Sequence, residues 1–207
     1  MIRNPQMPVN CSADKHHGET PRAEVQSRAL GNSERIRLKY GSYGIHILES
    51  SPGIRVSSLY SLHEGEKVNR TFAVTAYPEV IEPAFQEEHN AIINGESIGI
   101  VFAKNGWLIE KHHLYFGEIN IPRSHFSGSP GSDEAGKTRS AIHVYELIVE
   151  KDDSRYQYAF IAEVHHPEFL QLEDLAGIYG PEFDSHLQKK EKVGNFLDVI
   201  ESRILAL

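Results

Sequence analysis

Two charged residues in otherwise apolar segments are the first candidates for chemistry. Glu163 lies in the run YAFIAEV, and Arg55 lies in the run IRVSSLYSL. A buried carboxylate is costly unless it is paired, hydrogen-bonded or protonated, and a carboxylate in a partly apolar cavity has a raised pKa and can exchange protons near neutrality. Arginine can hold a carboxylate through two parallel hydrogen bonds. Together they suggest a site where Glu163 exchanges a proton and Arg55 binds an acid.

Each of these residues also has a purely structural interpretation. Glu163 can be solvated near a strand end or can form an ion pair with an arginine, and Arg55 can lie on an edge strand with its head group in water. Side chains alternate along a strand, so Glu163 shares a face with Ile161 and His165. We expect Glu163 to face a cavity, with Arg55 or a retained proton making its burial tolerable. His165 is then expected at the pocket rim, where it tunes the pKa of Glu163 or relays its proton.

A glycine-containing junction is the next candidate. In the segment NGESIGIVF, Gly95 and Gly99 lie around an expected change from helix to strand. Glycine at such a place lets a ligand or another backbone come close. The alternative is an ordinary helix end followed by a bulge.

Histidines raise the question of a metal. Glu163 and His165 could share a metal ion with His113 or His143 from neighbouring strands. The chain carries twelve histidines but no tight ligand spacing such as H-E-x-x-H, and no phosphate-binding loop, dinucleotide fingerprint or G-x-S-x-G elbow. We therefore expect solvated histidines, with no metal and no other cofactor.

The bulk properties narrow the class of protein. The chain has 207 residues and a formal net charge of −8, which argues against a nucleic-acid-binding surface. Cys11 is the only cysteine, so an internal disulfide is excluded and a reducing compartment fits. No run reaches the ~20 apolar residues of a membrane span, and no signal-peptide core is visible at the N-terminus. We expect a cytoplasmic protein without membrane partners, and the sequence leaves its oligomeric state open.

The elements that must position these residues follow from periodicity and turn signals. Residues 1–22 are polar and expected to be disordered, and residues 23–207 are expected to form a single domain. Helices are expected at 23–40, where Gly31 and Asn32 can divide the segment, and at 79–94, shortly after Pro167, and at 182–206. The expected strands are 44–50, 54–62, 68–78, 107–119, 141–150 and 156–164, with 97–103 placed just after the helix-to-strand junction and 122–140 as a loop. Short turns between successive strands predict an α+β fold: an antiparallel sheet of about six strands with helices packed on one face.

In this order, the pieces resemble the chorismate lyase family and, more broadly, the superfamily that it shares with the ligand-sensing UTRA domains of transcription regulators. The matching stretches are GNSERIRLKYG, GIRVSSLYS, RTFAVTAYP, NGESIGIVF and FIAEVHHP, which together span roughly residues 31–170. Each motif is short, and the order and spacing of the motifs carry the resemblance.

The resemblance implies roles for particular residues. The family's arginine, which holds a carboxylate of chorismate or of the 4-hydroxybenzoate product, corresponds to Arg55. Its glutamate, which lies across the pocket near the ring hydroxyl, corresponds to Glu163. Its Leu-Gly junction, which contributes backbone groups, corresponds to Ile98 and Gly99.

The chain also departs from the family pattern. Only Arg139 lies where the family often has an arginine pair, and His165 and His166 replace an apolar pair after the glutamate. The loop at 122–140 is longer than usual, and the helical extension at 171–207 has no clear counterpart. Arg139 and His165 are accordingly further candidates for the site.

Two functions follow as hypotheses. The first is a lyase that eliminates pyruvate from chorismate or a related cyclic enol-ether acid, with the ring enclosed by side chains such as Ile98, Phe102, Phe160 and Tyr145. The second is a non-catalytic module that binds a small aromatic acid, as the UTRA relatives do. Both predict a small anionic cyclic or aromatic carboxylic acid as the ligand.

Overall fold

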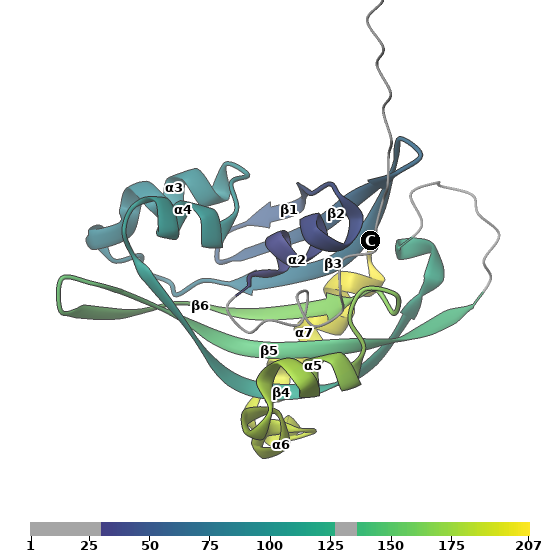
Figure 1. The fold of residues 1–207 in the computed structure, drawn as a ribbon. Coiled ribbons are helices and arrows are strands. Elements are labelled where there is room, and N and C mark those ends of the chain that lie inside the picture. The colour runs from purple at the N-terminus through teal and green to yellow at the C-terminus, as the bar shows by residue number, and fades with distance from the viewer. Residues whose placement is uncertain (1–29, 127–135) are drawn as a thin grey trace, which may run out of the picture.

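A computed structural model describes residues 30–126 and 136–207 (Figure 1). The predicted disordered tail at 1–22 and the N-terminal part of the first predicted helix lie outside these residues. Six strands form a single antiparallel sheet in the order β1-β2-β3-β6-β5-β4. Their bounds are β1 (Gly44–Ser51), β2 (Ile54–His63), β3 (Glu66–Ala76), β4 (Leu108–Pro122), β5 (Lys137–Lys151) and β6 (Ser154–His165). The α+β class and the antiparallel sheet are thus confirmed.

The order of elements repeats along the chain, although the sequence shows no internal repeat. A helix precedes β1–β3, a helical pair precedes β4–β6, and the two three-stranded halves join where β3 pairs with β6. Six α-helices and three 3₁₀ turns lie within the described residues. Their bounds are α2 (Asn32–Tyr40), η1 (Pro83–Phe85), α3 (Gln86–Ile93), α4 (Ile98–Lys104), η2 (Arg123–His125), α5 (Leu172–Tyr179), α6 (Pro181–His186), η3 (Lys190–Lys192) and α7 (Gly194–Leu205).

Several predicted elements differ in extent or type. The helix predicted at 79–94 begins only at Pro83, as a 3₁₀ turn that leads into α3. Residues 98–104, predicted to follow a helix-to-strand junction, form helix α4 because a short apolar run does not distinguish strand from helix. β5 already begins at Lys137, inside the predicted loop, and the predicted helix at 182–206 is divided into α6, η3 and α7.

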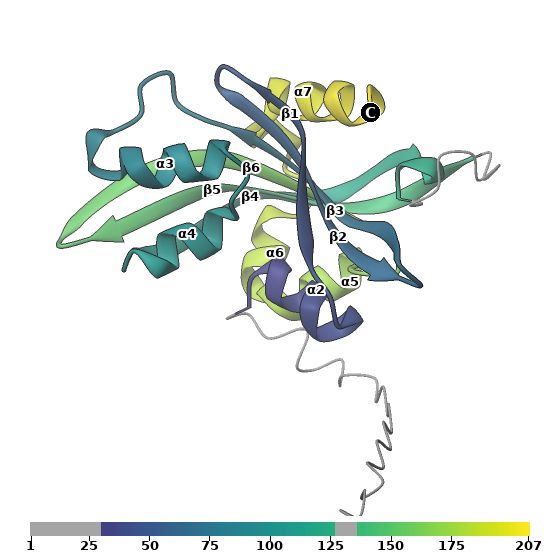
Figure 2. The ribbon, with the colours of Figure 1, turned by 90° about the horizontal axis from the view of Figure 1, so that it is seen from above.

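Helices cover both faces of the sheet, and the expectation of one covered face is wrong. Figure 2 shows α7 on one side of the sheet and α2, α5 and α6 on the other. Side chains of β3, β5 and β6 that point toward α7 are apolar, and they can leave water only if a helix covers them. The buried cluster on this face consists of Val56, Phe72, Val74, Tyr115, Ile121, Phe126, Ile142, Val144, Ala162, Val164, Val193, Ile200 and Ile204.

The opposite face carries Glu163 and is covered in two parts. Near α2, α5 and α6, a cluster includes Ile36, Phe116 and Phe183. Near α3 and α4, an aromatic cluster includes Phe85 and Phe102. The space between these two clusters holds the site described below.

The structure contains, within its described residues, no helix that is long and apolar enough to cross a membrane.

The packing of α7 gives a test of the second covered face. Ile204 is fully buried, whereas its neighbour Leu205 is 42% exposed. Replacing Ile204 with Ala should lower the free energy of unfolding by about 2–5 kcal/mol, the usual cost of a buried Ile→Ala change. Leu205→Ala is the matched control and should change it by less than about 0.5 kcal/mol. Equal effects of the two changes in urea unfolding would show that α7 does not cover the sheet.

Candidate functional site

A cavity of about 1120 Å³ lies on the face of the sheet that carries Glu163. Its floor is formed by β2, β3, β5 and β6, and its sides by α2, α4 and the first part of β4. The polar lining includes Asn32, Tyr43, Arg55, Ser57, Thr75, Ser97, Lys111, His113, Tyr145, Glu163, Tyr179 and Glu182, and the apolar lining includes Leu59, Ile98, Ile109, Leu147 and Ile161. A cavity of this size and mixed lining is typical of a small-molecule site, for which volumes of about 300–1,000 Å³ are usual.

Four of the predicted residues line this cavity together. They are Arg55 on β2, Ile98 and Gly99 in the first turn of α4, and Glu163 on β6. The sheet register explains their separation, because Arg55 is paired with Thr75 and Thr75 with Ile161. Arg55 therefore lies level with Ile161, one inward-facing position away from Glu163.

Arg55 is buried, with 1% of its surface exposed. One of its terminal nitrogens donates a hydrogen bond to the Glu96 carbonyl at 3.2 Å. Its Nε is buried and has no hydrogen-bond partner among the described residues. A buried guanidinium with an unused donor is costly unless a ligand oxygen accepts from it.

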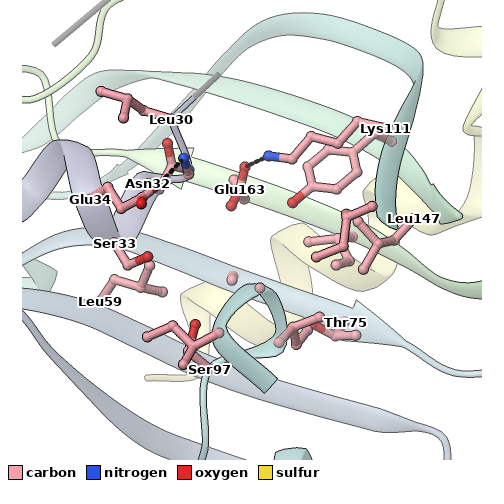
Figure 3. A pocket seen from close by; sticks show the side chains of 18 of the residues that line it. Leu30, Asn32, Ser33, Glu34, Leu59, Thr75, Ser97, Lys111, Leu147 and Glu163 are labelled. Atoms are coloured by element: carbon pink, nitrogen blue, oxygen red, sulfur yellow. Dashed lines mark hydrogen bonds and ion pairs between the residues drawn. The ribbon is translucent and has the colours of Figure 1, made fainter. Parts of the chain in front are cut away.

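Glu163 is paired with Lys111 rather than with Arg55. The Lys111 Nζ lies 3.6 Å from Glu163 Oε2 and 4.3 Å from the centroid of the Tyr145 ring, and Figure 3 shows Lys111 reaching toward Glu163 along the cavity wall. The sheet explains this pairing, because Lys111 and His113 on β4 face the same side as Leu147 and Tyr145 on β5. The prediction that Arg55 supports the burial of Glu163 is wrong.

The pair is charged. Burial by itself raises the pKa of Glu163, but the positive charge of Lys111, with Asn32 and Arg35, outweighs it, and the pKa lies below its ordinary value. Burial by itself lowers the pKa of Lys111, but the negative charge of Glu163 outweighs it and raises that pKa. The predicted raised pKa of Glu163 is therefore wrong: at neutral pH this group is a carboxylate, suited to accept a proton rather than to donate one.

His165 does not lie at the pocket rim. It is buried with 1% exposure, its Nδ1 lies 3.0 Å from the Thr71 hydroxyl, and its ring packs against Phe169. Burial lowers the pKa of His165 to about 4, so the ring is neutral. The end of β6 is covered by the segment that leads into α5, which includes Phe169.

Arg139 lies outside the cavity. Its side chain is 72% exposed and forms an ion pair with Glu118 on the neighbouring strand β4. Because β5 already begins at Lys137, Arg139 lies near the start of this strand, whereas the cavity is lined by later residues of β5, Tyr145 and Leu147.

The four candidates for enclosing a ring are only partly at the cavity. Ile98 and Tyr145 line it, Phe102 belongs to the aromatic cluster near α4, and Phe160 lies on the opposite face near Phe196.

His113 and His143, which the sequence analysis considered only as metal ligands, are buried beside Glu163 and contact each other. His143 is paired with Glu163 across β5 and β6, and its Nδ1 lies 4.0 Å from Glu163 Oε2. Its Nε2 lies 2.7 Å from Nδ1 of His113, whose Nε2 lies 3.1 Å from Oε2 of Glu182. Alternation along β4 and β5 would have placed both histidines on the Glu163 face. Within residues 30–126 and 136–207, no group of three or more His, Cys, Asp or Glu side chains is arranged to hold a metal ion.

Comparison of the chain with protein-family models and with curated proteins finds no match.

The Lys111–Glu163 pair can be tested by removing one partner. Lys111→Met leaves the Glu163 carboxylate buried without its cation, which should lower the free energy of unfolding by about 3–5 kcal/mol. The double change Lys111→Met with Glu163→Leu removes both charges and should recover most of this loss. Urea unfolding of the two variants and the parent checks the result. A single variant as stable as the parent would show that the pair does not compensate for the burial of Glu163.

The buried histidines predict a stability that falls in mild acid. Burial keeps His165 neutral in the fold down to about pH 4, whereas in the unfolded chain it binds a proton near its ordinary pKa of 6.5. Between these values the unfolded state binds more protons, so the free energy of unfolding falls as pH is lowered, by ~1.4 kcal/mol per pH unit for each such group. His143, whose pKa burial also lowers, adds to this slope.

Chemical unfolding at several pH values between about 6.5 and 4.5 measures this slope. His165→Gln should reduce the slope by the contribution of one group, and His46→Gln, on the exposed side of β1, should not. A parent protein whose stability does not change over this range would contradict the buried neutral state of His165.

Proposed function

We propose that this protein is a lyase that eliminates pyruvate from chorismate, or from a related cyclic enol-ether acid, to give a hydroxybenzoate-type product. The observation that carries the proposal is the meeting of three distant segments in one cavity. Arg55, the Ile98-Gly99 junction and Glu163 were assigned to a common site from the resemblance to chorismate lyases, and all of them line the cavity.

The state of Arg55 supports an acidic ligand. Its guanidinium is buried, lines the cavity and has a donor without a partner among the described residues. Ser57, on β2 with Arg55, and Thr75, on the adjacent strand β3, line the cavity beside this guanidinium. A ligand carboxylate in this position would satisfy the unused donor, because charge-assisted hydrogen bonds to arginine are short and directional.

The state of Glu163 supports a base. Loss of enolpyruvate with aromatisation breaks the bond between ring C3 and the ether oxygen and removes the proton from C4, whose electron pair forms the new ring double bond. The released enolpyruvate takes a proton on its methylene carbon and becomes pyruvate, so the reaction balances without any cofactor. Glu163 is an ionised carboxylate in the cavity and can accept the C4 proton.

One observation favours a second candidate, the non-catalytic binding module. Glu163 is already engaged by Lys111, and a carboxylate held in a permanent ion pair is a weaker base than an unpaired one. In this case Arg55 would hold a small aromatic acid, and the ion pair would serve only the fold.

An assay with purified protein and chorismate separates the two candidates. Release of 4-hydroxybenzoate, followed by its ultraviolet absorbance, supports the lyase. Binding of 4-hydroxybenzoate in calorimetry without any turnover of chorismate supports the binding module. If the protein neither turns over chorismate nor binds 4-hydroxybenzoate, both candidates are overturned.

The roles of Arg55 and Glu163 give distinct expected effects. Arg55→Ala should weaken binding of 4-hydroxybenzoate by about 1.5–3 kcal/mol, the usual size of a hydrogen bond to a charged group. Glu163→Gln, which keeps the shape of the side chain, should lower turnover by about 10²–10⁴. Arg139→Ala is the matched control, because it removes an exposed arginine outside the cavity, and it should change neither value. Unchanged affinity in the Arg55 variant would remove this residue from the site, and full activity of the Glu163 variant would make its role structural.

A further inference from the structure

Glu163 is connected to the outside of the cavity by a chain of closely spaced groups. Its Oε2 lies 4.0 Å from Nδ1 of His143 on β5, and Nε2 of His143 lies 2.7 Å from Nδ1 of His113 on β4. Nε2 of His113 lies 3.1 Å from Oε2 of Glu182 on α6. His143 and His113 are buried, whereas the side chain of Glu182 is 42% exposed. These four side chains thus connect Glu163, the most buried carboxylate of the site, to Glu182, a carboxylate in contact with water.

The carboxylate of Glu182, at the outer end of this row of side chains, defines which ring nitrogens carry protons. An ionised Glu182 can only accept a hydrogen bond, so a neutral His113 carries its proton on Nε2 and leaves Nδ1 as an acceptor. Nε2 of His143 then donates to that Nδ1, and the remaining nitrogen of His143, Nδ1, carries no proton. This nitrogen is therefore a buried acceptor that points toward Glu163.

Two buried atoms without hydrogen-bond partners face each other at the inner end. Glu163 Oε2 and His143 Nδ1 both lack a partner among the described residues, and both are acceptors when Glu163 is ionised. Two acceptors do not attract, which accounts for a separation of 4.0 Å. When Glu163 takes up a proton, it becomes a donor and loses its charge attraction to Lys111, and His143 Nδ1 is the nearby acceptor that it needs.

We propose that His143, His113 and Glu182 form a proton relay between Glu163 and water, an inference that rests on the proposed lyase function. When Glu163 has removed the C4 proton, this proton passes to His143 Nδ1, the Nε2 proton of His143 passes to His113, and the Nε2 proton of His113 passes to Glu182. The reverse sequence returns one proton to the cavity, where enolpyruvate requires one, and restores the starting ring states. No proton is gained or lost over a complete turnover.

The surroundings of His143 suit a relay better than a fixed positive charge. Its ring is stacked on Phe116, with centroids 4.4 Å apart and an angle of 11° between the planes, and this contact holds the ring in place. The charged groups that face His143 are Lys111, Arg35 and the carboxylate of Glu163. Its titratable neighbours are His113, His165, Tyr145 and Tyr179. Burial, followed by Lys111 and the other cations, keeps the pKa of His143 well below its usual range, so a proton taken up there is passed on rather than stored.

Nitrogen-15 NMR of the histidine rings in the unmodified protein tests the starting state. At neutral pH, His143 should be neutral with its proton on Nε2, and Nδ1 of His113 should be unprotonated. A proton on Nδ1 of His143, or a positively charged His143 ring, would overturn the relay. This measurement does not depend on any lyase activity.

Kinetics with chorismate test the function of the relay. His143→Gln and His113→Gln should each lower turnover by about 10²-fold, as expected for loss of a proton-transfer group, while KM changes little. Added imidazole should restore part of the turnover of these variants in proportion to its concentration, but not that of Glu163→Gln, which lacks the base itself. His46→Gln, on the exposed side of β1, is the control and should behave as the parent protein.

The outcomes separate this proposal from the one on which it rests. A parent protein without turnover of chorismate would contradict the lyase function, and the ring states from NMR would then decide on the relay alone. Turnover in the parent protein with both histidine variants within about twofold of it would overturn the relay and leave the lyase function intact. Loss of turnover in a folded variant without rescue by imidazole would give the histidines a structural role and also overturn the relay.

Discussion

The buried charge of Glu163 is the constraint on which the arrangement of the site depends. β6 is a central strand, paired with β3 on one side and β5 on the other, so Glu163 cannot reach water at a sheet edge. Its direct neighbours across the sheet are Ala73, which leaves space, and His143, which is polar. The compensating cation comes from Lys111, two strands away, whose long side chain spans β5. Without that reach, a carboxylate in this position would carry the full cost of an isolated buried charge.

The same constraint explains why the two faces of the sheet are covered differently. Toward α7, the side chains at the centre of β3, β5 and β6 are apolar, and a single amphipathic helix can cover them with Ile200 and Ile204. The opposite face carries charged and polar groups at its centre, and a helix laid across them would bury these groups without partners. Its helices therefore pack at the two ends of the sheet, on separate clusters, and the cavity lies between them.

The sequence predicted the elements better than it predicted their contacts. Alternation and turn residues located the strands, and alternation also placed Glu163 on the correct face, because a two-residue period needs no knowledge of neighbouring strands. The partner of Glu163 depends on the register of β4, β5 and β6 together, and a bulge between His113 and Tyr115 shifts that register in a way the sequence does not reveal. The assignments of His165 and Arg139 were wrong for similar reasons, since covering segments and strand ends decide exposure. The run at 98–104 became a helix because its apolar residues fit either period.

The charges in the cavity bear on how a dianionic acid would be received. Lys111 and Glu163 neutralise each other, so under the proposed function the unsatisfied donor of Arg55 would attract the first carboxylate. A second carboxylate on the same ligand would compete with Glu163 for Lys111, the cation that keeps the pKa of Glu163 low. If it succeeded, Glu163 would lose its counter-ion inside a buried site, and its affinity for a proton would rise while the substrate is bound. Under the proposed function, the Lys111–Glu163 pair would thus restrain Glu163 as a base until a ligand with two acidic groups binds. A ligand with a single carboxylate would bind at Arg55 and leave the pair intact.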